Sequence, residues 1–130
     1  MNIEADHIDE IDVPWTKIIR EDFHVVVYED GFPVSVGHLL FVPKYNTAGI
    51  IAEAFGDAHA YGRKKVADGE WDAYNIGMNC GAEAGQTIMW PHIHLIPRFK
   101  GDVADPIGGV RAVIPSQSNY KSTEYKNPNE

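Results

Sequence analysis

The sequence predicts an α+β domain in which an antiparallel sheet of about five strands carries one main helix on one face. Two observations lead to this fold class. Short segments rich in β-branched and aromatic residues follow one another with turn signals between them, which is typical of paired antiparallel strands. One long segment in the middle of the chain repeats its apolar residues with a helical period.

The first twenty residues are expected to form an N-terminal arm. They are polar with scattered apolar positions, and Pro14 followed by Thr16 predicts a short helix over residues 15–22. The arm begins acidic where a secretory signal would be basic and then apolar. We therefore expect a soluble, cytoplasmic protein.

The sheet is expected to begin at Phe23. Residues 23–30 (FHVVVYED) predict a strand that ends at the turn signal Asp30-Gly31. Residues 32–35 predict a short second strand, and residues 38–42 a third that stops at a proline.

The main helix is expected over residues 47–66, with Asn46 or Thr47 as its N-cap. Residues 71–79 then predict a fourth strand. Residues 90–96 predict the last one, because their side chains alternate in character.

The composition restricts the partners. The chain has 11 basic and 19 acidic residues, a formal charge of -8, which argues against binding along a nucleic-acid backbone. No apolar run approaches the roughly 20 residues that cross a bilayer, so no membrane partner is expected. A single cysteine, Cys80, excludes an internal disulfide. We expect one domain over residues 1–130 with a polar tail at 116–130.

Two histidines on one strand carry the chemistry. In an extended strand, His92 and His94 share a face with Trp90, whereas Ile93 and Leu95 point the other way. Neutral imidazoles side by side can attack phosphorus, and they can also chelate a metal with His38 as a third ligand. A third interpretation gives the pair no role.

The surrounding residues favour a phosphate site. Gly85, Gln86 and Thr87 offer close backbone approach and side-chain donors just upstream of the histidines. Small and polar positions alternate on the preceding strand, namely Asn75, Gly77, Asn79 and Gly81. Basic side chains cluster downstream, where they are either phosphate donors or a solvated rim: Arg98, Lys100 and Arg111.

From Phe23 to Pro115 the chain resembles the histidine-triad superfamily of nucleotide hydrolases and transferases. Four blocks occur in the order of that family: DGFPVSVGHLLFVPK, NIGMNCGAEAGQT, WPHIHLIPRFKGD and GGVRAVIP. The family motif is His-x-His-x-His followed by two apolar residues. In this chain Trp90 stands in place of the first histidine, and His92 and His94 are the second and third.

The resemblance implies a role for each matching position. His92 is the nucleophile, His94 donates to the phosphate, and His38 supports the same site. Gln86 and Thr87 contact the phosphates, Asp30 accepts from the ribose hydroxyls, and Asn79 borders the leaving group. Trp90 either packs or stacks on the base.

The expected reaction is in-line attack by His92 on an α-phosphorus, followed by hydrolysis of the nucleotidyl-histidine. A protonated His94 would stabilise the developing charge. Related transferases carry glutamine at the third motif position, so His94 favours a hydrolase of dinucleoside polyphosphates or nucleoside phosphoramidates.

The resemblance further implies a homodimer and a small-molecule nucleotide as the partner. No cofactor is expected to be required, although a divalent cation accompanying the substrate phosphates stays an alternative. Two other functions also stay open. They are a metal-dependent enzyme built on His38, His92 and His94, and a nucleotide-binding module without turnover.

Overall fold

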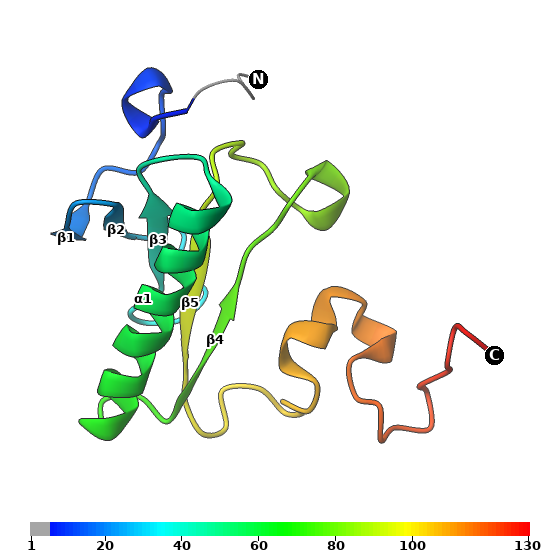
Figure 1. The fold of residues 1–130 in the computed structure, drawn as a ribbon. Helices are drawn as coiled ribbons and strands as arrows, with labels where there is room; N and C mark the ends of the chain where they lie inside the picture. The colour runs from blue at the N-terminus through cyan, green and yellow to red at the C-terminus, as the bar shows by residue number, and fades with distance from the viewer. Residues whose placement is uncertain (1–5) are drawn as a thin grey trace. The chain divides into compact units, whose positions relative to one another are not determined.

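The computed structural model describes residues 6–130, which form two compact units, residues 6–98 and residues 99–130. The first unit contains the sheet and the long helix (Figure 1). Its elements are η1 (Ile8–Glu10), β1 (Ile18–Glu21), β2 (Val25–Glu29), β3 (Leu39–Pro43), α1 (Ala48–Ala67), β4 (Ala73–Gly77), η2 (Ala82–Ala84) and β5 (Ile93–Arg98).

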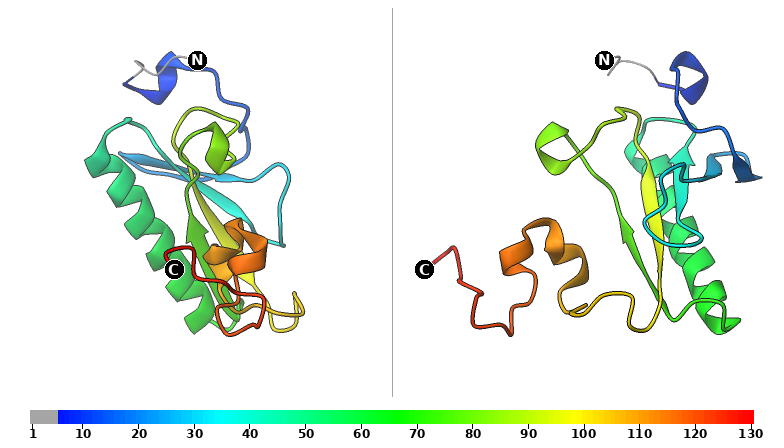
Figure 2. Two further views of the ribbon diagram at one scale, coloured as in Figure 1. Left: turned by 90° about the vertical axis from the view of Figure 1, so that its right-hand side faces the viewer. Right: turned by 180° about the vertical axis from the view of Figure 1, so that it is seen from behind.

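The five strands form one antiparallel sheet in the order β1-β2-β3-β5-β4. The helix α1 runs along one face of this sheet (Figures 1 and 2). This arrangement confirms the expected α+β fold, with five strands and one main helix. Thr47 is the N-cap of α1, and its side chain accepts a hydrogen bond from the Ile50 N–H.

The expected helix over residues 15–22 is wrong, because part of this segment is the edge strand β1. Ile18 pairs with Tyr28 and Glu21 with Val26. The adjacent β-branched residues Ile18 and Ile19 suit a strand. The free edge of β2 also offers this segment main-chain hydrogen bonds, which outweigh its weak helical signal.

The expected strand over residues 32–35 is also wrong. β2 pairs directly with β3, and residues 30–38 form the loop between them. The Asp30 N–H donates to the His38 carbonyl at 3.1 Å, which closes the base of this loop. Residues 32–35 therefore have no neighbouring strand to pair with, and Phe32 is 92% exposed.

Each face of the sheet has its own cover. α1 packs on the face that carries Phe41, whose ring meets Tyr61 of the helix. On the opposite face, the N-terminal segment contributes Ile8 to a buried cluster, and three of its other apolar residues pack against that cluster. The remaining members of the cluster are Val26, Tyr28, Leu40, Val42 and Trp90. The residues before Asp6 lie outside the described part.

The second unit, residues 99–130, contains η3 (Gly109–Val113) and η4 (Pro115–Gln117). Arg111 holds it together by donating to the carbonyls of Gln117 and Ser118, and its guanidinium lies over the ring of Tyr120. Arg111 therefore has partners inside its own unit. That the whole chain acts as one domain stays a prediction.

Within residues 6–130, no helix combines the length and the apolar character that a membrane span requires.

Candidate active site

The two motif histidines lie on the sheet face that is turned away from α1. His94 belongs to β5 and stands opposite Leu40 of β3 and Gly77 of β4. His92 comes just before this strand, and the centroids of the two rings are 5.2 Å apart. The expected pair of imidazoles on one face is confirmed, although the strand begins at Ile93 rather than at residue 90.

A main-chain carbonyl fixes the orientation of His92. Its Nδ1 lies 2.8 Å from the carbonyl oxygen of Trp90. A carbonyl oxygen only accepts, so Nδ1 carries the proton and Nε2 keeps its lone pair. Nε2 has no hydrogen-bond partner among residues 6–130. No buried side-chain nitrogen or oxygen there lacks a partner, so this atom is open to solvent although the residue is only 8% exposed.

His38 is fixed in the opposite sense. The Val34 N–H donates to its Nδ1 at 3.0 Å, so Nδ1 is an acceptor and the proton of the neutral ring lies on Nε2. Its Nε2 is 2.9 Å from Nδ1 of His94. His38 is 2% exposed, so solvent offers no competing partner.

This contact determines the tautomer of His94. Because the His38 Nε2–H points at His94 Nδ1, that nitrogen accepts, and the proton of His94 lies on Nε2. His92 and His94 therefore expose opposite atoms, a lone pair from one ring and an N–H from the other. A nitrogen lone pair and an N–H donor thus stand side by side.

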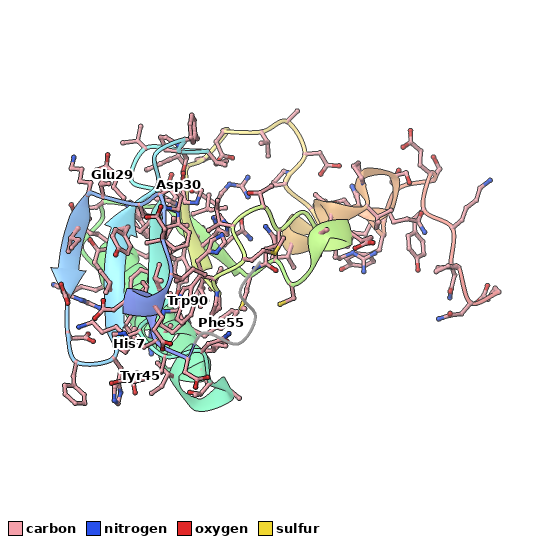
Figure 3. All side chains as sticks on the ribbon, turned by 90° about the horizontal axis from the view of Figure 1, so that it is seen from above. His7, Glu29, Asp30, Tyr45, Phe55 and Trp90 are labelled. Carbon is pink, nitrogen blue, oxygen red and sulfur yellow. The ribbon has the colours of Figure 1, made fainter. Side chains whose placement is uncertain are left out.

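Asp30 lies beside the same histidines at the end of β2, directly after Glu29 (Figure 3). One carboxylate oxygen accepts from the Phe32 N–H at 2.8 Å. The other is 3.3 Å from His38 Nε2 and 3.8 Å from His94 Nδ1. The structure thus joins Asp30 to the site, while its role toward a ribose stays a prediction.

Burial keeps the inner imidazoles neutral. It lowers the pKa of His94 to about 4, with help from His92 and His38 and against the opposing effect of Asp30. Burial also lowers the pKa of His38, again against Asp30. His94 is therefore neutral at pH 7 in the free protein, where the ring still donates through Nε2–H, and a protonated His94 beside a bound phosphate stays a prediction.

Trp90 is part of the core and not of a binding surface. It is 1% exposed and packs in the cluster beneath the N-terminal segment (Figure 3). Its indole N–H donates to the Pro43 carbonyl at 2.9 Å. Of the two expected roles for this residue, packing is right and stacking on a substrate is wrong, because no face of the ring is accessible.

The loop between β4 and β5 contains the other expected phosphate ligands. The Gln86 side chain accepts from the Gly81 N–H at 2.8 Å and donates to the Ile88 carbonyl at 3.0 Å, so it closes the loop. Its amide nitrogen keeps a second N–H, so the expected contact of Gln86 with phosphate stays a prediction. Thr87 is exposed, and Asn79 is half-buried after the end of β4.

Of the three basic residues that follow the motif, Arg98 donates to the Asn75 side chain at 2.7 Å. It therefore braces β5 against β4. The pairing explains why polar Asn75 is placed in this strand.

Sequence reasoning missed Trp15. Its ring centroid is 4.8 Å from that of His92 and 5.8 Å from that of Tyr28. This indole packs against His92 from the side of the N-terminal segment. A large aromatic residue just before the Ile18-Ile19 pair was a signal, but the wrongly expected helix obscured it.

The metal-ligand set that the structure brings together differs from the expected one. Ligand atoms of Asp30, His38 and His94 lie within 4.8 Å of one another, whereas His92 is not in the set. Coordination through His38 would need the lone pair of Nε2. The Val34 N–H places the proton on that atom, so this arrangement does not fit a metal ion.

Comparisons with known proteins give one family. The model of the HIT domain matches residues 13–101. An uncharacterised HIT-like protein of Methanocaldococcus jannaschii is 36% identical over 92 residues, covering 66% of this chain and 71% of that protein. The adenosine 5′-monophosphoramidase HNT1 of Saccharomyces cerevisiae is 32% identical over 90 residues, covering 67% of this chain and 56% of that protein.

The fold of this chain is also similar to that of a solved histidine triad family structure. The crystal structure of a zinc-bound histidine triad family protein from Mycobacterium smegmatis superposes with a TM-score of 0.62 at 28% identity. The match covers 72% of this chain and 73% of that one.

Proposed function

The chain belongs to the HIT-domain family, and from this membership and its two histidine tautomers we propose that it is a nucleotide hydrolase. The observation that carries the proposal is the pairing of a free His92 Nε2 lone pair with a His94 Nε2–H. Nucleotidyl transfer through a covalent intermediate needs such a pair, because one group must form a bond to phosphorus while another stabilises the charge on the phosphate oxygens.

The proposed reaction has two steps. His92 Nε2 attacks the α-phosphorus in line, forming an N–P bond as the bond to the leaving phosphate or amine breaks, and an amine leaving group takes up a proton from solvent. Water then attacks the same phosphorus and gives up a proton to solvent, the N–P bond breaks, and a nucleoside monophosphate leaves. The His94 N–H donates to a phosphate oxygen in both steps, and the loss of such a donor costs about 3 kcal/mol of barrier.

The substrate class we propose is a dinucleoside polyphosphate or a nucleoside phosphoramidate. The relative from Saccharomyces cerevisiae is named an adenosine 5′-monophosphoramidase, which supports the second of these. Thr87, exposed on the loop before β5, is the side chain we propose for the leaving-group side, with Asn79. Asp30 is proposed to accept from the ribose. We further propose a cytoplasmic homodimer.

The test compares wild type with His92→Ala on a panel of both substrate classes. We expect hydrolysis to fall by at least about a thousandfold in the variant, because no other group supplies the nucleophile. His59→Ala serves as the control, since His59 is an exposed histidine of α1. Rapid quenching of wild type should give a mass increase of one nucleotidyl group on His92.

Other outcomes separate the alternatives. Equal activity in wild type and His92→Ala would refute the proposal that His92 is the nucleophile. Tight nucleotide binding without turnover would indicate a binding module. We also propose that no cofactor is required; activity lost with a chelator and restored by a divalent cation would contradict this.

A further inference from the structure

The apolar side chains of the loop of residues 30–38 do not hold it in place. Phe32 is 92%, Val34 74% and Val36 84% exposed, so burial of these side chains contributes little to its conformation. The main chain nevertheless makes a specific contact, because the Val34 N–H reaches the buried ring of His38. The Asp30 contacts with Phe32 and His38 hold the base of the loop, and a side-chain hydrogen bond to β5 holds the part nearer Val34.

Ser35 provides that interaction. Its hydroxyl donates to the carbonyl of Pro97 at 2.7 Å, in a partly buried position. The pairing of β3 with β5 extends only to Leu39 and Leu95, so Pro97 lies two residues beyond the last pair. The serine hydroxyl therefore ties the loop to β5 where the ladder has ended.

The geometry points to Ser35 as a positioning residue for the two inner histidines. By tying the loop to β5, Ser35 keeps the Val34 N–H on His38 Nδ1, and this determines which nitrogen of His94 carries the proton. The chain of contacts thus runs from an exposed loop to the atom that faces the substrate. The consequence for activity rests on the proposed function, whereas the consequence for the tautomers does not.

Loss of the tie would allow the opposite arrangement. Without the Val34 N–H, His38 can carry its proton on Nδ1 and accept through Nε2. His94 can then donate from Nδ1 to His38 or to Asp30, whose carboxylate faces both rings. Its Nε2 would present a lone pair to the phosphate, which repels the substrate oxygens where a donor had attracted them.

The test reads the tautomers directly. Protein labelled with ¹⁵N in its histidines is examined by long-range ¹H–¹⁵N correlation at pH 7, with signals assigned through His38→Gln and His94→Gln. In wild type and in Ser35→Thr, which keeps the hydroxyl, we expect His94 protonated on Nε2. In Ser35→Ala we expect a mixture of both tautomers and kcat reduced about fivefold, the worth of one net hydrogen bond, with KM little changed.

Two further variants make the result decisive. Ser116→Ala, at an exposed serine in η4, is the matched control and should change nothing. Val34→Pro removes the N–H itself and should give the tautomer mixture even where Ser35→Ala folds poorly.

The inference is overturned if folded Ser35→Ala keeps the wild-type tautomer pattern, whatever its activity; where Ser35→Ala does not fold, a wild-type pattern in Val34→Pro overturns it. A tautomer change in a protein that hydrolyses none of the panel would leave this inference standing and refute the proposed function instead.

Discussion

At the level of single residues, main-chain groups set the direction of each imidazole. The Trp90 carbonyl accepts from His92, and the Val34 amide donates to His38. Backbone groups have fixed polarity, so they determine tautomers more firmly than side chains that can rotate or titrate. The exposed lone pair and the exposed N–H follow from these two contacts.

His94 predicts how stability depends on pH. The pKa of His94 is about 4 in the folded protein, against 6.5 for an unperturbed histidine. Between these pH values the unfolded chain therefore binds more protons than the folded protein. Stability is therefore full above pH 6.5 and is lost as pH falls toward 4, by on the order of 3 kcal/mol. Denaturant unfolding at pH 7 and pH 4.5 should show that His94→Gln loses less unfolding free energy between these pH values than wild type does. Equal losses in the two proteins would contradict this.

Trp90 predicts a second effect on stability. Trp90→Phe leaves the Pro43 carbonyl without its donor and removes part of a buried ring. We expect a loss of about 2 kcal/mol in the free energy of unfolding, with His92-dependent hydrolysis retained in the folded fraction. Urea denaturation measures the free energy of unfolding, and the substrate panel measures hydrolysis. A loss of activity without a loss of stability would indicate that Trp90 acts in substrate binding and not only in packing.

At the level of elements, α1 approaches the sheet closely at one glycine. A Cβ on Gly62 would lie 2.8 Å from the ring of Tyr74 in β4, whereas nothing lies within 4 Å of a Cβ on Gly56. The helix and the edge strand are thus in contact at Gly62 with no room for a methyl group. The strand β4 pairs in turn with β5, where Gly77 stands opposite His94.

Gly56 and Gly62, two of the three glycines in α1, predict opposite effects. Gly56→Ala should stabilise the protein by about 0.5 to 1 kcal/mol, because alanine favours the helix and meets no neighbour. Gly62→Ala should destabilise it by about 1 to 3 kcal/mol, because the Tyr74 ring must move. Thermal and urea unfolding of the two variants measure the difference. If both substitutions changed stability in the same direction, the contact between Gly62 and the Tyr74 ring would have room for a methyl group.

At the level of the whole molecule, residues 99–130 form a unit with its own close contact. Gly108 has a φ of +100°, and a Cβ there would lie 2.0 Å from the Ser118 carbonyl oxygen. Only glycine allows both the conformation and the approach. The unit therefore depends on Gly108 as well as on Arg111.

Gly108→Ala tests the independence of the two units. We expect faster proteolysis and hydrogen exchange within residues 99–130, and unchanged exchange in the strands of residues 6–98. Mass spectrometry of peptides from both units gives the measurement, and Gly31→Ala, where a Cβ meets nothing, is the control. Equal acceleration in both units would show that they unfold together.

The sequence by itself determined the elements whose signal is periodic and long. The helix over 48–67 and the strands β2 to β5 were predicted because apolar spacing fixes which face is buried, whatever the partner. The same alternation placed His92 and His94 together on one face of the sheet.

Tertiary structure alone decided the rest, because each remaining feature depends on a partner distant in the chain. β1 exists because β2 offers it an edge, and Trp15 reaches His92 across the sheet. Gln86 is used within its loop, and the neutrality of His94 comes from burial that no local pattern records. Hydrogen-bond geometry and desolvation are properties of assembled neighbours, so they become visible only when the chain has folded.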